Sequence, residues 1–197
     1  MRLRICCFLT VAFLISACRD SGVTPPVSNA NLLVTNGSQG NVSNNAMKLI
    51  SPAFQDGEPI PKKYTCQGEN ISPPFSLVGV PASAKSLALI CDDPDAPGKT
   101  WTHWVLFDLP ASTREIPEGL PRQETIANGA KQGITDFKTA GYGGPCPPSG
   151  THRYFFKIYA LDTDFELAGG ASKEQLLKAI EGHVIVEGQL IGTYQKQ

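Results

Sequence analysis

The sequence predicts a mainly β fold, a sandwich or barrel of strands with a minor helical part. The chain contains 19 glycines and 16 prolines among its 197 residues, well above ordinary usage, so the backbone must turn often. Short apolar segments rich in β-branched and aromatic residues lie between these turns. Only one segment has the periodicity and the capping residues of a helix.

Six segments have the length and composition of strands. Each is bounded by residues that favour turns, and no internal repeat relates one segment to another. The six are Lys48–Ile50, Pro74–Val78, Ser86–Cys91, His103–Leu109, Arg153–Leu161 and His183–Ile191.

The predicted helix begins after Ser172, which forms a capping box with Gln175 three residues later. Leu176 and Ile180 are four residues apart, so they share one apolar face of this helix. Gly182 ends it, because glycine readily adopts the left-handed conformation found at helix C-termini.

Composition and charge exclude several classes of protein. The 17 Lys and Arg residues nearly balance the 18 Asp and Glu residues, which gives a net charge of −1 and argues against a nucleic-acid binder. Hydrophobic residues make up 41% of the chain and charged residues 18%, which excludes wholesale disorder and a coiled coil. No apolar run reaches the roughly 18 residues that a membrane-spanning helix needs.

The N-terminal residues predict export and lipid attachment. A cationic start at Met1–Arg4 precedes the apolar run Ile5–Ile15, an order typical of a signal peptide covering residues 1–17. The sequence Ile15–Cys18 resembles a bacterial lipobox, in which the cysteine is lipidated and becomes the new N-terminus. Cleavage without lipidation is the alternative. Because Arg19 is not the aspartate that retains lipoproteins at the inner membrane, we expect outer-membrane anchoring if the organism is Gram-negative.

The remaining chain divides into a tether and a domain. Residues 18–46 consist mostly of small and polar residues and predict a flexible spacer. Residues 47–197 hold all the predicted strands and form the domain proper. With the lipid at Cys18, this domain would face the periplasm.

Three cysteines lie within the predicted domain, an odd number for an oxidising compartment, so at most one disulfide can form among them. Cys66 and Cys146 both lie in loops rich in glycine and proline, and we expect these two to pair. Cys91 ends an apolar strand and is expected in the core.

Three apolar rows of strand residues each end in a titratable residue. Alternate positions of Ser86–Asp93 lead to Asp93, those of His103–Leu109 begin at His103, and those of His152–Ala160 begin at His152. Buried polar groups need partners, so the three ends are expected to share one polar pocket or else to face water separately.

A loop of glycines and prolines at residues 140–150 precedes His152. Glycines let the backbone approach a ligand and prolines stiffen the frame, so such a loop beside histidines suits an anion, phosphate above all. A purely structural turn is the alternative. The loop lacks the spacing of a Walker or dinucleotide-binding motif.

Four motifs occur in order along the chain: Asp93–Pro97 (DPDAP), Trp101–Trp104 (WTHW), Gly141–Pro145 (GYGGP) and His152–Tyr154 (HRY). Together they resemble the phosphatidylethanolamine-binding protein family. Further motifs, among them Gly144–Pro148 (GPCPP), resemble its bacterial Raf-kinase-inhibitor-like branch. The resemblance implies an antiparallel two-sheet β-sandwich with one or two short helices.

The resemblance also implies a pocket for phosphate-like anions, including phospholipid head groups. The histidines, the Gly144 amide and the Tyr154 hydroxyl would donate to the anion, while aspartates would orient the histidines and raise their pKa. Trp101 or Trp104 would form an apolar or cation–π wall for an ammonium group. The implied ligand-binding residues are Asp93, Asp95, Trp101, His103, Gly144, Pro145, His152 and Tyr154.

We therefore predict a non-enzymatic binding protein whose partners are an anionic or phosphorylated small ligand and, through Cys18, a membrane. No catalytic residue, cofactor, metal ligand, nucleic acid or protein partner is assigned. A metal-dependent hydrolase using the histidines and aspartates is one alternative, although no HEXXH or GXSXG motif is present. A module that inhibits a protease or another protein is the other.

Overall fold

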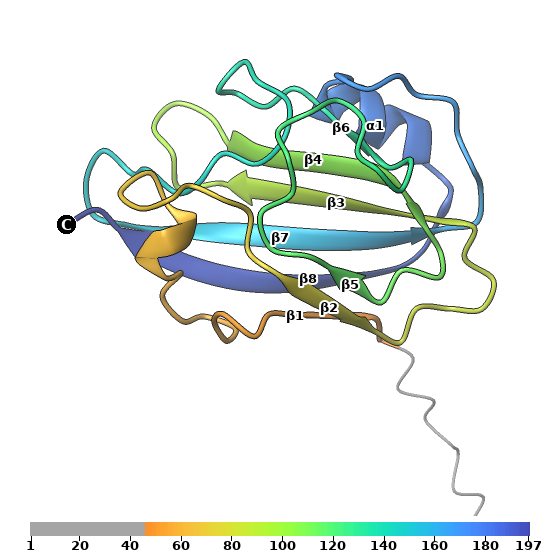
Figure 1. Ribbon diagram of the computed structural model, residues 1–197, viewed down its shortest axis with the longest axis horizontal. Coiled ribbons are helices and arrows are strands. Elements are labelled where there is room, and N and C mark those ends of the chain that lie inside the picture. Colours follow the sequence, from red (N-terminus) through yellow and green to blue (C-terminus); the bar gives the residue numbers. More distant parts are fainter. Residues whose placement is uncertain (1–45) are drawn as a thin grey trace, which may run out of the picture. The chain divides into compact units, whose positions relative to one another are not determined.

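Two antiparallel sheets form a β-sandwich in the computed structural model, which describes residues 46–197 (Figure 1). The smaller sheet has the order β1-β2-β5 and the larger the order β6-β4-β3-β7-β8. This architecture confirms the expected fold class. The elements are β1 (Lys48–Ile50), the 3₁₀ helix η1 (Lys62–Tyr64), β2 (Phe75–Val78), β3 (Ser86–Asp93), β4 (Trp101–Pro110), β5 (Glu115–Ile116), β6 (Lys131–Gln132), β7 (Thr151–Leu161), α1 (Lys173–Ile180) and β8 (Val184–Gln195).

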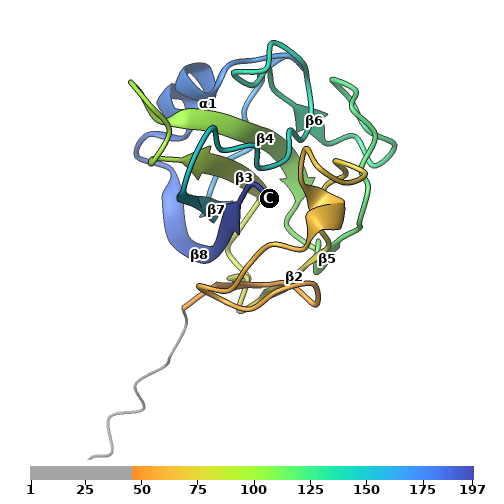
Figure 2. The ribbon, with the colours of Figure 1, turned by 90° about the vertical axis from the view of Figure 1, so that its left-hand side faces the viewer.

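The main core lies between the two sheets. Leu87, Leu89 and Cys91 point from β3 into this layer, where they meet Phe75 and Leu77 of the smaller sheet. Side chains alternate along a strand, so the intervening residues of β3 face the opposite side of the larger sheet. Figure 2 shows the smaller sheet on one side of the larger sheet and α1 on the other.

Helix α1 covers the second face of the larger sheet. Its Leu176 and Ile180 are buried against Ala88 and Ile90 of β3, which explains why this strand is an almost continuous apolar run. The Ser172 side chain accepts a hydrogen bond from the Gln175 amide, while the Gln175 side chain accepts one from the Ser172 amide. The capping box predicted from the sequence is therefore confirmed.

Two β-bulges in β4 overturn one expectation. The sequence pattern places His103, Val105, Phe107 and Leu109 on a single face, but Val105 and Phe107 lie beneath α1 whereas Leu109 lies in the main core. Cys91 pairs with Trp104 and Asp92 with Thr102, so His103 is an extra residue on β4. Each bulge reverses the alternation of side chains, which strict two-residue periodicity does not anticipate.

A disulfide joins Cys66, just after η1, to Cys146 in the glycine–proline loop, with the Cα atoms 5.4 Å apart. This is the pair expected from the sequence, and Cys91 is a free, buried thiol. Within residues 46–197 no helix is long and apolar enough to cross a membrane. The signal peptide at 1–17, the lipidation of Cys18 and nearly all of the tether at 18–46 lie outside the described residues.

Candidate functional site

A cavity of about 320 Å³ opens where the end of β3 meets the starts of β4 and β7. Neighbouring strands run antiparallel, so Asp93 at the end of β3 lies beside His103 near the start of β4 and His152 near the start of β7. All three side chains are buried and line the cavity. The three polar ends of the strand rows thus meet in one pocket. The other lining residues are Ala96, Pro97, Trp101, Phe137, Cys146, Pro147 and Pro148.

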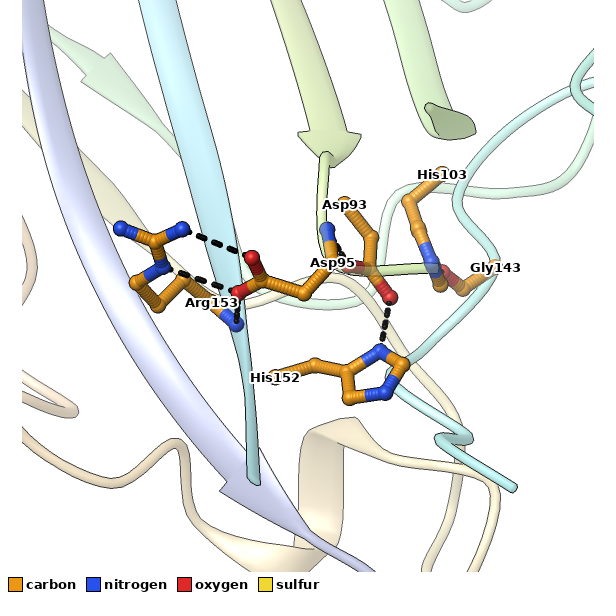
Figure 3. A network of polar contacts seen from close by, with 6 residues as sticks. All are labelled: Asp93, Asp95, His103, Gly143, His152 and Arg153. Atoms are coloured by element: carbon orange, nitrogen blue, oxygen red, sulfur yellow. Dashed lines mark hydrogen bonds and ion pairs between the residues drawn. The ribbon is translucent and has the colours of Figure 1, made fainter. Parts of the chain in front are cut away.

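Asp93 orients His152. The Nδ1 atom of His152 lies 2.7 Å from Oδ2 of Asp93, and the other oxygen of Asp93 accepts the amide of Asp95 at 2.9 Å. A carboxylate only accepts hydrogen bonds, so Nδ1 of His152 carries the proton and Nε2 is left for a ligand. Figure 3 shows this pair with the Asp93 carboxylate between the two imidazoles.

Asp95 contacts no histidine, contrary to the expectation that both aspartates orient one. Its carboxylate accepts three hydrogen bonds from Arg153, from the backbone amide at 2.9 Å, from Nε at 2.9 Å and from a terminal nitrogen at 2.7 Å. The side-chain hydrogen bonds from Arg153 lower the pKa of Asp95 to about 2. In Figure 3 this carboxylate points away from the imidazoles. Asp95 supports the site through its backbone bond to Asp93.

His103 is held by the glycine loop. Its Nδ1 donates to the carbonyl of Gly143 at 2.6 Å, and the Gly143 amide donates back to the carbonyl of His103 at 2.8 Å. Burial lowers the pKa of His103, although the Gly143 carbonyl and nearby Asp93 partly oppose this. The family resemblance implied a raised pKa, and for His103 that expectation is wrong because burial outweighs the nearby carboxylates. His103 therefore presents an unprotonated Nε2 at neutral pH.

Two buried donors have no hydrogen-bond partner, one in the cavity wall and one in the core beside it, since Tyr154 does not itself line the cavity. They are the hydroxyl of Tyr154 and the indole Nε1 of Trp101, and among the described residues these are the only such side-chain atoms. Tyr154 has 0% of its surface exposed, and its ring meets that of His103 edge-on with centroids 5.1 Å apart. Burial, then the charge of Asp93 and a smaller hydrogen-bonding contribution from that carboxylate, raise the pKa of Tyr154, which keeps the hydroxyl protonated; Asp93 is therefore near this hydroxyl but outside hydrogen-bond geometry.

A search against protein-family models matches residues 50–195 to the model described as phosphatidylethanolamine-binding protein. The match covers nearly all of the described sandwich. The chain belongs to the phosphatidylethanolamine-binding protein family.

Relatives of this family member include a UPF0098 protein of Methanothermobacter thermautotrophicus, 57% identical over 150 residues that cover 76% of this chain and 99% of the relative. Two solved structures share its fold, each with a TM-score of 0.72. The putative phosphatidylethanolamine-binding protein homologue CT736 of Chlamydia trachomatis is 46% identical and covers 78% of this chain and 99% of its own. YbcL of E. coli, described as a new member of the mammalian family, is 32% identical, and the match covers 77% of this chain and 99% of YbcL.

Gly144 and Pro145 of the family motif do not line the cavity. The Gly144 amide donates to Oδ1 of Asn70 at 2.7 Å, and the Pro145 carbonyl accepts the amide of Cys66 at 3.1 Å. The expected donation from the Gly144 amide to an anion is therefore wrong, because Asn70 already occupies that amide. A Cβ at Gly144 would lie 2.4 Å from the Tyr64 carbonyl oxygen, so this glycine serves a close backbone contact.

The two tryptophans of the WTHW motif have different environments. Trp104 is fully buried, and its indole nitrogen donates to Oε1 of Gln132 at 2.8 Å. Trp101 lines the cavity, so it is the tryptophan of the pair available to a ligand.

Sequence reasoning missed Phe137. This residue lines the cavity and packs edge-on against both Trp101 and His103. It lies in a short turn outside the predicted strands, so no periodic pattern indicates its role. Among residues 46–197, no group of three or more His, Cys, Asp or Glu side chains is placed to hold a metal ion.

Proposed function

We propose that this family member binds the phosphate-like anionic group of a small molecule in the cavity, without catalysing a reaction. The observation that carries the proposal is the unpartnered indole N–H of Trp101, a residue of the cavity wall, together with the unpartnered hydroxyl of Tyr154, whose ring packs on His103. Leaving a donor buried and unpaired costs about 1–3 kcal/mol, so such groups in or beside a cavity wall favour a ligand with acceptor oxygens.

The histidines complete the donor set once they are protonated. Both use Nδ1 within the protein, His152 with Asp93 and His103 with Gly143, so each leaves Nε2 for a ligand. A protonated Nε2 donates a charge-assisted hydrogen bond to an anion. Because burial lowers the pKa of His103, anion binding draws a proton onto this residue. We therefore expect proton uptake with the anion.

Isothermal titration calorimetry with inorganic phosphate tests this function. We expect saturable binding that is weakened about tenfold or more in His103→Gln, the range for a hydrogen bond to a charged group. His183→Gln is the matched control, since His183 pairs with Asp162 and does not line the cavity. Repeating the titration in buffers of different ionisation enthalpy measures proton uptake, which His103→Gln should diminish. Absence of phosphate binding to the wild type, or equal affinity in both variants, would contradict the proposal.

We also propose that the protein is exported and anchored to a bacterial membrane by a lipid on Cys18, facing the periplasm. The support is the order of charge, apolar run and small residues in 1–17, followed by a polar spacer at 18–46. In a Gram-negative organism this would be the outer membrane, because Arg19 follows the cysteine.

A further inference from the structure

Phe137 lines the cavity and has 39% of its surface exposed. Its ring centroid is 5.6 Å from that of Trp101 and 5.2 Å from that of His103, with interplanar angles of 74° and 72°. The three rings therefore form a continuous edge-to-face wall that leads from the imidazole to the solvent.

The local backbone holds Phe137 in this position. Thr135 donates through both its amide and its hydroxyl to the carbonyl of Thr139, and the Lys138 amide donates to the Thr135 carbonyl. Lys138 has a φ of 63°, so the turn adopts a left-handed residue directly after the phenylalanine. A Cβ at Gly143 would lie 2.4 Å from the Phe137 ring, which shows how closely the ring packs on the loop that also holds His103.

The cavity lining combines two chemically different sets of residues. Asp93, His103 and His152 supply its titratable groups, while the remaining lining is dominated by rings and prolines. Among the lining residues of the described chain there is no lysine or arginine. A volume of about 320 Å³ reaches the range of pockets for small organic ligands, more than a bare phosphate ion occupies.

One cation already lies at the Trp101 ring of the aromatic wall. Lys99 already lies over the indole, with Nζ 5.4 Å from the ring centroid, and it forms an ion pair with Asp136. A second cation at that indole would be repelled by the ammonium group of Lys99. An uncharged flat or apolar group meets no such repulsion and covers the exposed surface of Phe137.

Resting on the proposed function, we infer that the ligand carries its anionic group on an uncharged, flat or apolar organic part, and that Phe137 selects this part. The anion would lie against His103, His152 and the Trp101 indole N–H, on the side of His103 that meets Tyr154. The organic part would contact Phe137 and two lining prolines of the glycine–proline loop, Pro147 and Pro148. Phe137 is then a specificity-determining residue.

Separate titrations with three probes test this inference. The full-length protein is titrated with inorganic phosphate, phenyl phosphate and phosphoethanolamine by calorimetry at one pH. We expect phenyl phosphate to bind about tenfold more tightly than either other probe, the ratio that aromatic contact and apolar burial support. Phe137→Ala should remove most of this ratio. Phe155→Ala, which changes a half-buried ring on the outer face of β7, should retain it.

Each outcome of this experiment is decisive. Phosphoethanolamine binding as tightly as phenyl phosphate in the wild type would overturn the inference whatever the variants do, and so would a phenyl phosphate preference that survives Phe137→Ala. In both cases phosphate binding itself stands, so the proposed function stands with it. If none of the three probes binds the wild type, the proposed function fails and the inference fails with it.

Discussion

Replacing Tyr154 by phenylalanine should change the unfolding free energy and the affinity for phosphate in opposite directions. The ring of Tyr154 packs in the main core between the sheets, and Phe156 and Ile158 of the same strand share that core. Phenylalanine keeps the ring and removes only a buried hydroxyl that makes no hydrogen bond of good geometry in the protein, although Asp93 lies near it. We therefore expect Tyr154→Phe to be more stable than the wild type without ligand and to bind phosphate more weakly.

The magnitude follows from the burial of the hydroxyl. Removing an unsatisfied buried polar group restores about 1–3 kcal/mol of unfolding free energy. For a domain of this size, each kcal/mol raises Tm by roughly 2–4 °C. Loss of one hydrogen bond to a charged ligand weakens binding by roughly tenfold or more. Added phosphate should therefore raise Tm less in the variant than in the wild type.

Thermal unfolding with and without phosphate, together with calorimetric titration, measures both effects. Tyr159→Phe is the matched control, because this tyrosine lies half-buried on the same strand but outside the main core and the cavity. A phosphate-free Tyr154→Phe protein that is less stable than the wild type, or one that binds phosphate equally well, would refute the reasoning about this hydroxyl.

Three further expectations concern pH, the disulfide and the membrane. Because the folded-state pKa of His103 lies below 6.5, protonation of this histidine favours the unfolded chain. Urea unfolding without phosphate should therefore show an unfolding free energy that falls as the pH drops through 6.5. A pH profile that is unchanged in His103→Gln would contradict this. Cys66 and Cys146 are 80 residues apart, so replacing both by serine should lower the unfolding free energy by about 4.5 kcal/mol. Reducing the disulfide of the wild type with a dithiol should lower the unfolding free energy by the same amount. A decrease below about 1 kcal/mol would exclude a cross-link that constrains the unfolded chain. Cys18→Ser should move the protein from the membrane to the soluble fraction, and unchanged fractionation would argue against a lipid anchor.

Much of the candidate site could be predicted because it depends on local patterns. The rows that end at Asp93 and His152 alternate regularly along β3 and β7, and both rows face the main core as expected. Two cysteines in glycine–proline loops indicated the disulfide, and Ser172 with Gln175 indicated the start of α1. In each case the signal lies within a few residues of the feature it predicts.

The hydrogen-bond partners within the site were less predictable. Asp95 was expected to hydrogen-bond a histidine, but it accepts hydrogen bonds from Arg153. The Gly144 amide was expected to donate to an anion, but it donates to Asn70. These partners lie far away in the sequence, and several residue types would satisfy each group. Sequence motifs therefore identify the residues of a site but do not predict their hydrogen-bond partners.

By itself, the sequence determined the mainly β fold, the helix, the paired cysteines and the family, because periodicity, turn residues and ordered motifs are local properties of the chain. Only the tertiary structure decided that a bulge brings His103 to the cavity, that burial lowers its pKa and that Phe137 stands beside it. The physical reason is that strand register, desolvation and contact between loops arise when segments 30 or 40 residues apart pack together, as His103 does with Phe137 and Gly143.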